Sequence, residues 1–273
     1  MRLEEIVLEL QKKAFHIQHG FSMNRFFASL LCILSLCMTS CSKKESKAHV
    51  IAYDASFLSI DAQGREVNIA AFLNDLTMEL SKKTRLPITL SSVNWDTILY
   101  GLQNGEYHGV YSGMTPRIFN EKMLNFSNVL LPSGAVLLSR ESSKVKKLEG
   151  LSNKEVGVIQ GSHSELILEK YPEVIIRVYE SAPALLNDLA TATIEGAVLG
   201  LLPALGYVND LYKGSIVISQ GPLNDLGLRF VTQKPSGDAF YSSVAKALSR
   251  LESDGTLEGL RKKWGLELSN AGH

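Results

Sequence analysis

Cysteine is scarce in this chain of 273 residues, and each of the three lies within the first 41 positions. They are too few for a disulfide framework, and no cysteine or histidine spacing resembles a zinc site. The six histidines are scattered along the sequence. We therefore predict neither a metal site nor a cofactor.

Neither sign of charge is in excess, because 28 lysines and arginines balance 28 aspartates and glutamates. A nucleic-acid-binding protein usually has a basic excess or a basic stripe, so that class is excluded. Apolar residues make up 45% and charged residues 21%, a balance that allows a large core and excludes global disorder. After residue 41 no apolar run is long enough to span a membrane, so the body of the chain is expected to be soluble.

Several catalytic motifs are also missing. The sequence has no GxxxxGK phosphate loop, no GxGxxG and no GxSxG nucleophile elbow. Ser162 and His163 are adjacent, but sequence neighbours rarely orient as a nucleophile and its base. We interpret this segment as a polar loop that opens a helix, and His108 as a residue at the edge of a strand.

An export signal occupies the first part of the chain. Arg25 precedes an apolar stretch over 26–38, and two small residues, Thr39 and Ser40, come directly before Cys41. This pattern is typical of a secretory signal, and its end resembles a bacterial lipobox. That resemblance implies cleavage before Cys41 and lipidation of its thiol; an uncleaved anchor helix is the alternative interpretation.

The predicted signal peptide is 1–40, but 1–22 does not suit it. Glu4, Glu5 and Glu9 are acidic, whereas a signal begins with positive charge. We therefore expect translation to start at Met23. The polar segment 41–48 is predicted to be a tether between the lipid and the folded domain.

The remaining chain alternates strand and helix patterns, which indicates an α/β protein with mostly parallel sheets. About nine strands in this length favour two lobes over one sheet. The predicted strands include 49–53, 87–90, 108–111, 136–139, 156–159, 174–178 and 196–202. The predicted helices are 69–83, 95–102, 164–171, 185–189, 240–251 and 256–264.

Three stretches carry a family resemblance. The first combines WDTIL (95–99), LQNG (102–105), SGMT (112–115) and NFS (125–127); the second is VGVIQGS (156–162). The third runs from the AL at 247–248 through DGTL (254–257) to KW (263–264). In this order they resemble the polar amino-acid-binding (family 3) periplasmic solute-binding proteins of bacterial ABC importers. The resemblance extends over about 49–266.

That resemblance implies a type II periplasmic-binding-protein fold, with two lobes, two hinge strands and a ligand cleft between the lobes. The first lobe would comprise 49–133 and 227–273, and the second 134–226. The implied protein is a monomeric, lipid-anchored binding protein in the periplasm or on the cell surface. It would bind a small amino-acid-like solute and pass it to an ABC permease in the cytoplasmic membrane, without being an enzyme.

The same resemblance assigns site residues. Trp95 would be an aromatic platform for the ligand, although it could instead only anchor its helix to the core. Tyr53 or Phe57 would supply the opposite plate. The loop with Ser112, Gly113 and Thr115 would receive the ligand carboxylate, and these are also ordinary turn residues. From the second lobe, Gly161, Ser162 and His163 would offer N–H groups at a helix start, with Ser162 as the N-cap.

Two positions depart from the family pattern. The family has an arginine five residues after the threonine, where this chain has Asn120; Arg117 is the nearest replacement. It also has an aspartate for the ligand ammonium, and counting back from Pro203 places Leu201 there. A buried ammonium without a carboxylate is costly. Either another acid, Asp54 or Asp225, replaces it, or the ligand is not a standard α-amino acid.

Two other functions stay open. A cyclohexadienyl-dehydratase-like enzyme on the same fold would need an acid or base in the cleft, for which Glu165 and His163 are the candidates. Both are equally explained as first-turn helix residues. The third possibility is a binding module that signals to a membrane partner.

Overall fold

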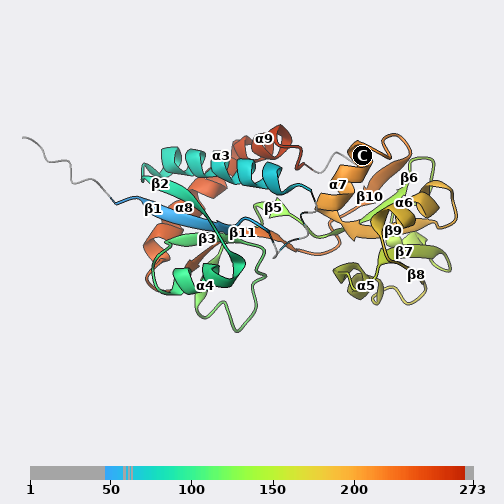
Figure 1. Cartoon of the computed structure of the whole chain (residues 1–273), viewed down its shortest axis with the longest axis horizontal. Coiled ribbons are helices and arrows are strands. Elements are labelled where there is room, and N and C mark those ends of the chain that lie inside the picture. Colours follow the sequence, from blue (N-terminus) through green and yellow to red (C-terminus); the bar gives the residue numbers. More distant parts are fainter. Residues whose placement is uncertain (1–46, 58–59, 61, 63, 268–273) are drawn as a thin grey trace, which may run out of the picture. The chain divides into compact units, whose positions relative to one another are not determined.

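Two β-sheets organise the computed structural model, which describes residues 47–57, 60, 62 and 64–267 (Figure 1). The first sheet has the strand order β2-β1-β3-β11-β4, and β5 also pairs with β11. Its strands are β1 (His49–Asp54), β2 (Ile88–Val93), β3 (Gly109–Ser112), β4 (Leu124–Phe126), β5 (Leu131–Pro132) and β11 (Gly227–Gln233). The signal peptide, Cys41 and the tether up to residue 46 lie outside the described residues.

Four helices cover the first sheet: α3 (Glu66–Thr84), α4 (Trp95–Gln103), α8 (Asp238–Ser253) and α9 (Thr256–Lys263). Side chains of a strand alternate between the two faces of its sheet. Ile51 and Tyr111 therefore join the core under α3, α8 and α9, whereas Ala52 and Val110 pack in the core under α4. Both faces are covered, so the strand ends and the loops that follow them are left to build a site.

The second sheet has the order β10-β6-β9-β7-β8. Its strands are β6 (Ala135–Arg140), β7 (Glu155–Ile159), β8 (Ile175–Tyr179), β9 (Gly196–Gly200) and β10 (Ile216–Gln220). The helices here are α5 (His163–Leu168), α6 (Ala182–Ala190) and α7 (Leu201–Asn209), with a 3-10 turn at Leu148–Gly150. Strand alternation again divides the core, with Val136 facing the α6 and α7 side and Leu137 the α5 side.

The chain passes between the sheets twice, and backbone hydrogen bonds join the two passages. The N–H groups of Ser133 and Gly134 donate to the carbonyl oxygen of Leu226, at 3.0 and 3.1 Å. The N–H of Leu223 donates to Ala135 O at 2.7 Å. The strands at 135–220 thus belong to the second sheet, and β11 returns to the first. The lobe boundaries given above stay a prediction.

Two expectations about the sheets differ from the structure. Both sheets are mixed, because β11 runs antiparallel to β3, and β6 runs antiparallel to β9 and β10. The apolar run 196–202 is not one strand, since β9 ends at Gly200 and Leu201 begins α7. Proline is tolerated in the first turn of a helix, where its missing N–H needs no partner, so Pro203 fits this position.

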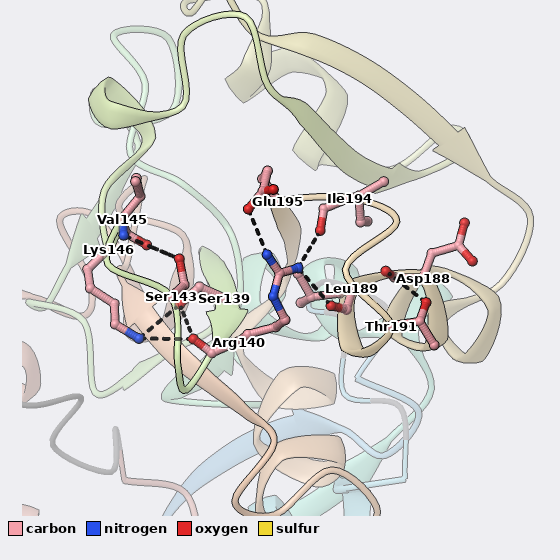
Figure 2. Close-up of polar contacts among 10 residues, drawn as sticks. All are labelled: Ser139, Arg140, Ser143, Val145, Lys146, Asp188, Leu189, Thr191, Ile194 and Glu195. Carbon is pink, nitrogen blue, oxygen red and sulfur yellow. Dashed lines mark hydrogen bonds and ion pairs between the residues drawn. The ribbon is translucent and has the colours of Figure 1, made fainter.

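Arg140, at the end of β6, secures the connection from α6 to β9 (Figure 2). Its guanidinium donates to the carbonyl oxygens of Leu189 at 3.0 Å and Ile194 at 2.7 Å, and to the Glu195 carboxylate at 2.7 Å. The carbonyl oxygen of Arg140 accepts a bond from Lys146 Nζ at 3.0 Å. These contacts fix the turn that starts β9, whose other end reaches the pocket described next.

Candidate functional site

A pocket of about 680 Å³ lies beside the carboxyl ends of β7, β8 and β9. Open α/β sheets characteristically bind ligands at this edge, because loops and helix starts gather there. Segments that follow strands of the first sheet complete the wall. The lining residues are Ile60, Gly113, Thr115, Ser133, Ala135, Ile159, Ser162, His163, Ser164, Glu180, Ser181, Ala182, Pro183, Leu199, Gly200, Tyr207, Asn224 and Leu226.

The loop after β3 brings two predicted residues, Gly113 and Thr115, to this pocket. Ser112, predicted with them, is 2% exposed, and its hydroxyl accepts a bond from the Met114 N–H at 3.2 Å. Ser112 therefore shapes the loop from beneath and does not line the pocket.

Asn120 holds the same loop from its far end. Its Oδ1 accepts the N–H of Arg117 at 2.7 Å, and its Nδ2 donates to Thr115 O at 3.1 Å. The side chain is only 6% exposed, so the amide is committed to the loop backbone. Arg117 is exposed and does not line the pocket. The structure thus gives no contact through which Arg117 replaces the family's arginine.

The start of α5 brings Ser162 and His163, two of the residues expected to bind the ligand, to the wall of the pocket. Ser162 is the N-cap residue of this helix, but its side chain makes no capping bond, and its Oγ is buried without a partner in the structure. Gly161, with φ of +68°, makes the turn before it and donates its N–H to Glu165 Oε1 at 3.1 Å. The Ser162 hydroxyl therefore has no hydrogen-bond partner among the described residues.

The aromatic side chains differ from the expectation. Phe57 is 2% exposed in the core of the first sheet and stacks on Tyr53, with ring centroids 5.6 Å apart. Trp95 is half-buried at the start of α4 and packs against the cluster containing Ile98. None of the three lines the pocket, whereas Tyr207 on α7, which sequence reasoning missed, does.

The acid expected to bind the ammonium group of the ligand is also not found where the family resemblance suggests it. Leu201 is fully buried in the core between the second sheet and its helices, and Gly200 reaches the pocket instead. A carboxylate at position 201 would therefore face the core. Asp54 accepts bonds from Ser56 N and Oγ, at 3.1 and 2.7 Å, and is 4% exposed. It does not line the pocket.

Among the described residues that line the pocket, Glu180 is the carboxylate, and the sequence did not point to it. It follows β8 directly and precedes Ser181, whose hydroxyl accepts the N–H of Ala184 and caps α6. Its position between a strand end and a helix cap was a usable signal, since such positions gather at the ligand-binding edge of an α/β sheet. Asp225, the other acid considered, has a side chain that is 76% exposed and lies 3.5 Å from Arg229.

Tyr179, the last residue of β8, stays protonated near this edge. Burial and a 2.7 Å hydrogen bond from its hydroxyl to Asp188 raise the pKa of Tyr179 to about 12. Arg177 lies between two carboxylates, 3.4 Å from Glu155 and 3.5 Å from Asp188. The charge of this arginine is therefore balanced by groups other than Glu180.

The described residues show neither a candidate metal site nor a helix suited to crossing a membrane. They contain no group of three or more histidines, cysteines, aspartates or glutamates placed to hold a metal ion. None of their helices combines the length and the apolar character needed to cross a membrane.

Comparison with known proteins identifies relatives of this chain. The chain is 27% identical over 238 residues to the arginine-binding extracellular protein ArtP of Bacillus subtilis, covering 85% of this chain and 92% of that protein. It is 23% identical over 225 residues to the L-cystine-binding protein TcyJ of Escherichia coli K12, with coverages of 81% and 84%.

Solved structures agree on the fold. The L-cystine solute receptor of Neisseria gonorrhoeae in its unliganded open conformation superimposes with a TM-score of 0.65 at 16% identity, covering 81% of this chain and 94% of that one. A substrate-binding domain of a putative amino acid ABC transporter from Streptococcus pneumoniae gives 0.63 at 20% identity, with coverages of 80% and 100%. The model of one family matches residues 50–267. The chain therefore belongs to the bacterial extracellular solute-binding proteins, family 3.

Proposed function

We propose that the mature chain is a lipid-anchored extracytoplasmic protein that binds a small polar solute, an amino acid or a relative of one, and delivers it to an ABC importer. The observation that carries the proposal is the pocket at the carboxyl ends of β7, β8 and β9. Loops from strands of both sheets line it, which is what a protein that closes on its solute requires.

The relatives support the solute class. Two relatives that are matched along most of their length are named for binding arginine and L-cystine. The pocket wall is suited to small polar molecules, because Thr115, Ser133 and Ser162 line it together with apolar residues such as Ile159 and Leu199. Serine and threonine hydroxyls both donate and accept hydrogen bonds, so they can bind either end of an amino acid.

Native mass spectrometry of the purified protein tests the binding function. We expect a small solute to co-purify, and calorimetric titration of the denatured and refolded protein should show that this solute rebinds at one site. Thr115→Val should weaken that rebinding, whereas Thr97→Val, at an exposed position on α4, should not. Chemical conversion of the solute by the protein would instead support the enzyme interpretation.

The lipid anchor needs a separate test, because Cys41 lies outside the described residues. Metabolic labelling with a fatty-acid probe should mark the wild-type protein and leave Cys41→Ala unmarked. Labelling that persists in this variant would exclude lipidation at Cys41 and leave the solute-binding function untouched.

A further inference from the structure

The charge balance of the pocket identifies the kind of solute that fits it, and this inference rests on the proposed function. Glu180 is the single carboxylate among the described lining residues, which include no lysine and no arginine. The described lining residues also include one histidine, His163. Among the described lining residues, a solute therefore meets one acidic side chain and no lysine or arginine.

The Glu180 carboxylate is not neutralised by its surroundings. Within the described part of the chain it forms no hydrogen bond or ion pair, and its side chain is exposed to the pocket. The nearest cation along the strand, Arg177, is held by Glu155 and Asp188 at 3.4 and 3.5 Å. The acceptor oxygens of Glu180 are thus not taken up by another described side chain.

Two of the three helices that start at the pocket, α6 and α7, offer few donors to compensate an anion. At α6 the Ser181 hydroxyl already accepts the Ala184 N–H, and Pro183 has no N–H. At α7 the N–H of Leu201 donates to Gly134 O at 3.0 Å, and Pro203 likewise lacks an N–H. A helix N-terminus favours anions largely through its free N–H groups, so both ends are weakened as anion sites.

We propose that Glu180 binds the cationic group of the solute, and that the pocket selects amino acids or amines that carry an amidinium, guanidinium or second ammonium group. The carboxylate and the cation would form a charge-assisted hydrogen bond, which is stronger than a neutral one. Tyr207 lines the same pocket, and a tyrosine ring is one of the groups on which organic cations stack. Acidic solutes are disfavoured, because they would face Glu180 without a basic partner.

A matched ligand pair tests the inference. L-arginine and L-citrulline have nearly the same shape, but only arginine carries a charge on its side chain. Calorimetry should give wild-type protein an affinity for arginine at least about tenfold higher than for citrulline, the effect of one hydrogen bond to a charged group. L-glutamate should not bind. Agmatine, which keeps the guanidinium but lacks the carboxylate, should still bind more tightly than citrulline.

The variant Glu180→Gln should reduce the arginine affinity about tenfold, to that of citrulline, and leave citrulline unaffected. Glu173→Gln is the matched control, because Glu173 is exposed just before β8 and does not line the pocket. Thermal unfolding should show that both variants fold as the wild type does, since both side chains are exposed.

The outcomes separate this inference from the proposed function. Equal affinities for arginine and citrulline, or an arginine affinity unchanged in Glu180→Gln, would overturn the role of Glu180. Binding of a neutral or acidic amino acid alone would do the same while leaving the solute-binding function intact. If none of the twenty amino acids, citrulline or agmatine binds and no solute co-purifies, both the inference and the proposed function fail.

Discussion

Asn120 donates through Nδ2 to the carbonyl oxygen of Thr115, five residues earlier and 3.1 Å away. The same side chain accepts the N–H of Arg117. One amide thus closes the loop that presents Thr115 to the pocket, at the position where the family resemblance implies an arginine. The side chain at 120 therefore has a structural role here, because both ends of its amide bind the loop backbone.

Asn120→Ala should destabilise the protein and weaken solute binding together. The substitution removes two hydrogen bonds from a nearly buried amide and leaves the Thr115 carbonyl and the Arg117 N–H without that partner. We expect a loss of about 1–3 kcal/mol in the free energy of unfolding, measured by urea denaturation. Asn128→Ala, at an exposed position, should change it by less than about 0.5 kcal/mol. Equal effects of the two variants would contradict this role.

Arg140→Met should lower the free energy of unfolding markedly, because Arg140 binds the turn that leads into β9. It leaves the carbonyl oxygens of Leu189 and Ile194 without the guanidinium, and we expect a loss of about 2–3 kcal/mol in stability. Arg177→Met removes an arginine whose side chain is 45% exposed, and should cost less than about 1 kcal/mol. Guanidinium chloride denaturation of the two variants measures the difference; a larger loss for Arg177→Met would refute it.

Stability should fall as the pH rises from about 10 to about 12. Burial, followed by the bond to Asp188, raises the pKa of Tyr179 to about 12, above the ordinary value near 10. In this window the unfolded chain binds fewer protons than the native protein, so the free energy of unfolding decreases with pH. Burial also raises the pKa of Tyr111.

Tyr179→Phe should therefore reduce this alkaline slope without abolishing it, because Tyr111 still contributes. Urea denaturation at pH 8, 10 and 11.5 measures the slope. Tyr100→Phe, which changes an exposed tyrosine on α4, is the control and should keep the wild-type slope. A Tyr179→Phe slope as steep as that of the wild type would show that this phenol does not carry the effect.

Asp75 should contribute to the loss of stability of the protein at acidic pH. Its carboxylate accepts Lys263 Nζ at 2.6 Å and Trp264 Nε1 at 3.0 Å, and the bond from Lys263 is the main reason that the pKa of Asp75 is lowered. A lowered pKa stabilises the fold above the unfolded value near 3.9, and that stability is lost as the pH falls below it.

The variant Asp75→Asn should consequently lose stability at pH 7 and show a smaller further loss between pH 5 and pH 3 than the wild type. Tryptophan fluorescence during urea unfolding measures both, and Trp264 reports locally on the contact. Glu169→Gln, at an exposed position, serves as the control. If Asp75→Asn loses as much stability between pH 5 and pH 3 as the wild type does, Asp75 is not responsible for the acid sensitivity.

Periodicity and motif order in the sequence sufficed to predict the α/β class, the family and most helices and strands. The apolar positions of α3, for example Ile69, Leu73 and Leu80, recur at helical spacing and are buried in the structure. Such patterns are local, because one strand or helix must bury one face whatever its partner is. The family resemblance, not periodicity, pointed to Gly113, Thr115, Ser162 and His163, which line the pocket.

Tertiary structure decided the features that depend on distant partners. The antiparallel strand β11 pairs with β3 more than a hundred residues earlier, and no local pattern specifies that pairing. The apolar run ending at Leu202 could be a strand or a helix start, and burial of Leu201 against the second sheet favoured the helix. Likewise, only the folded chain shows that Phe57 is in the core and that Glu180 lines the pocket. The sequence determines which faces must be buried, whereas the packing of elements far apart in the chain determines which polar groups remain facing a solute.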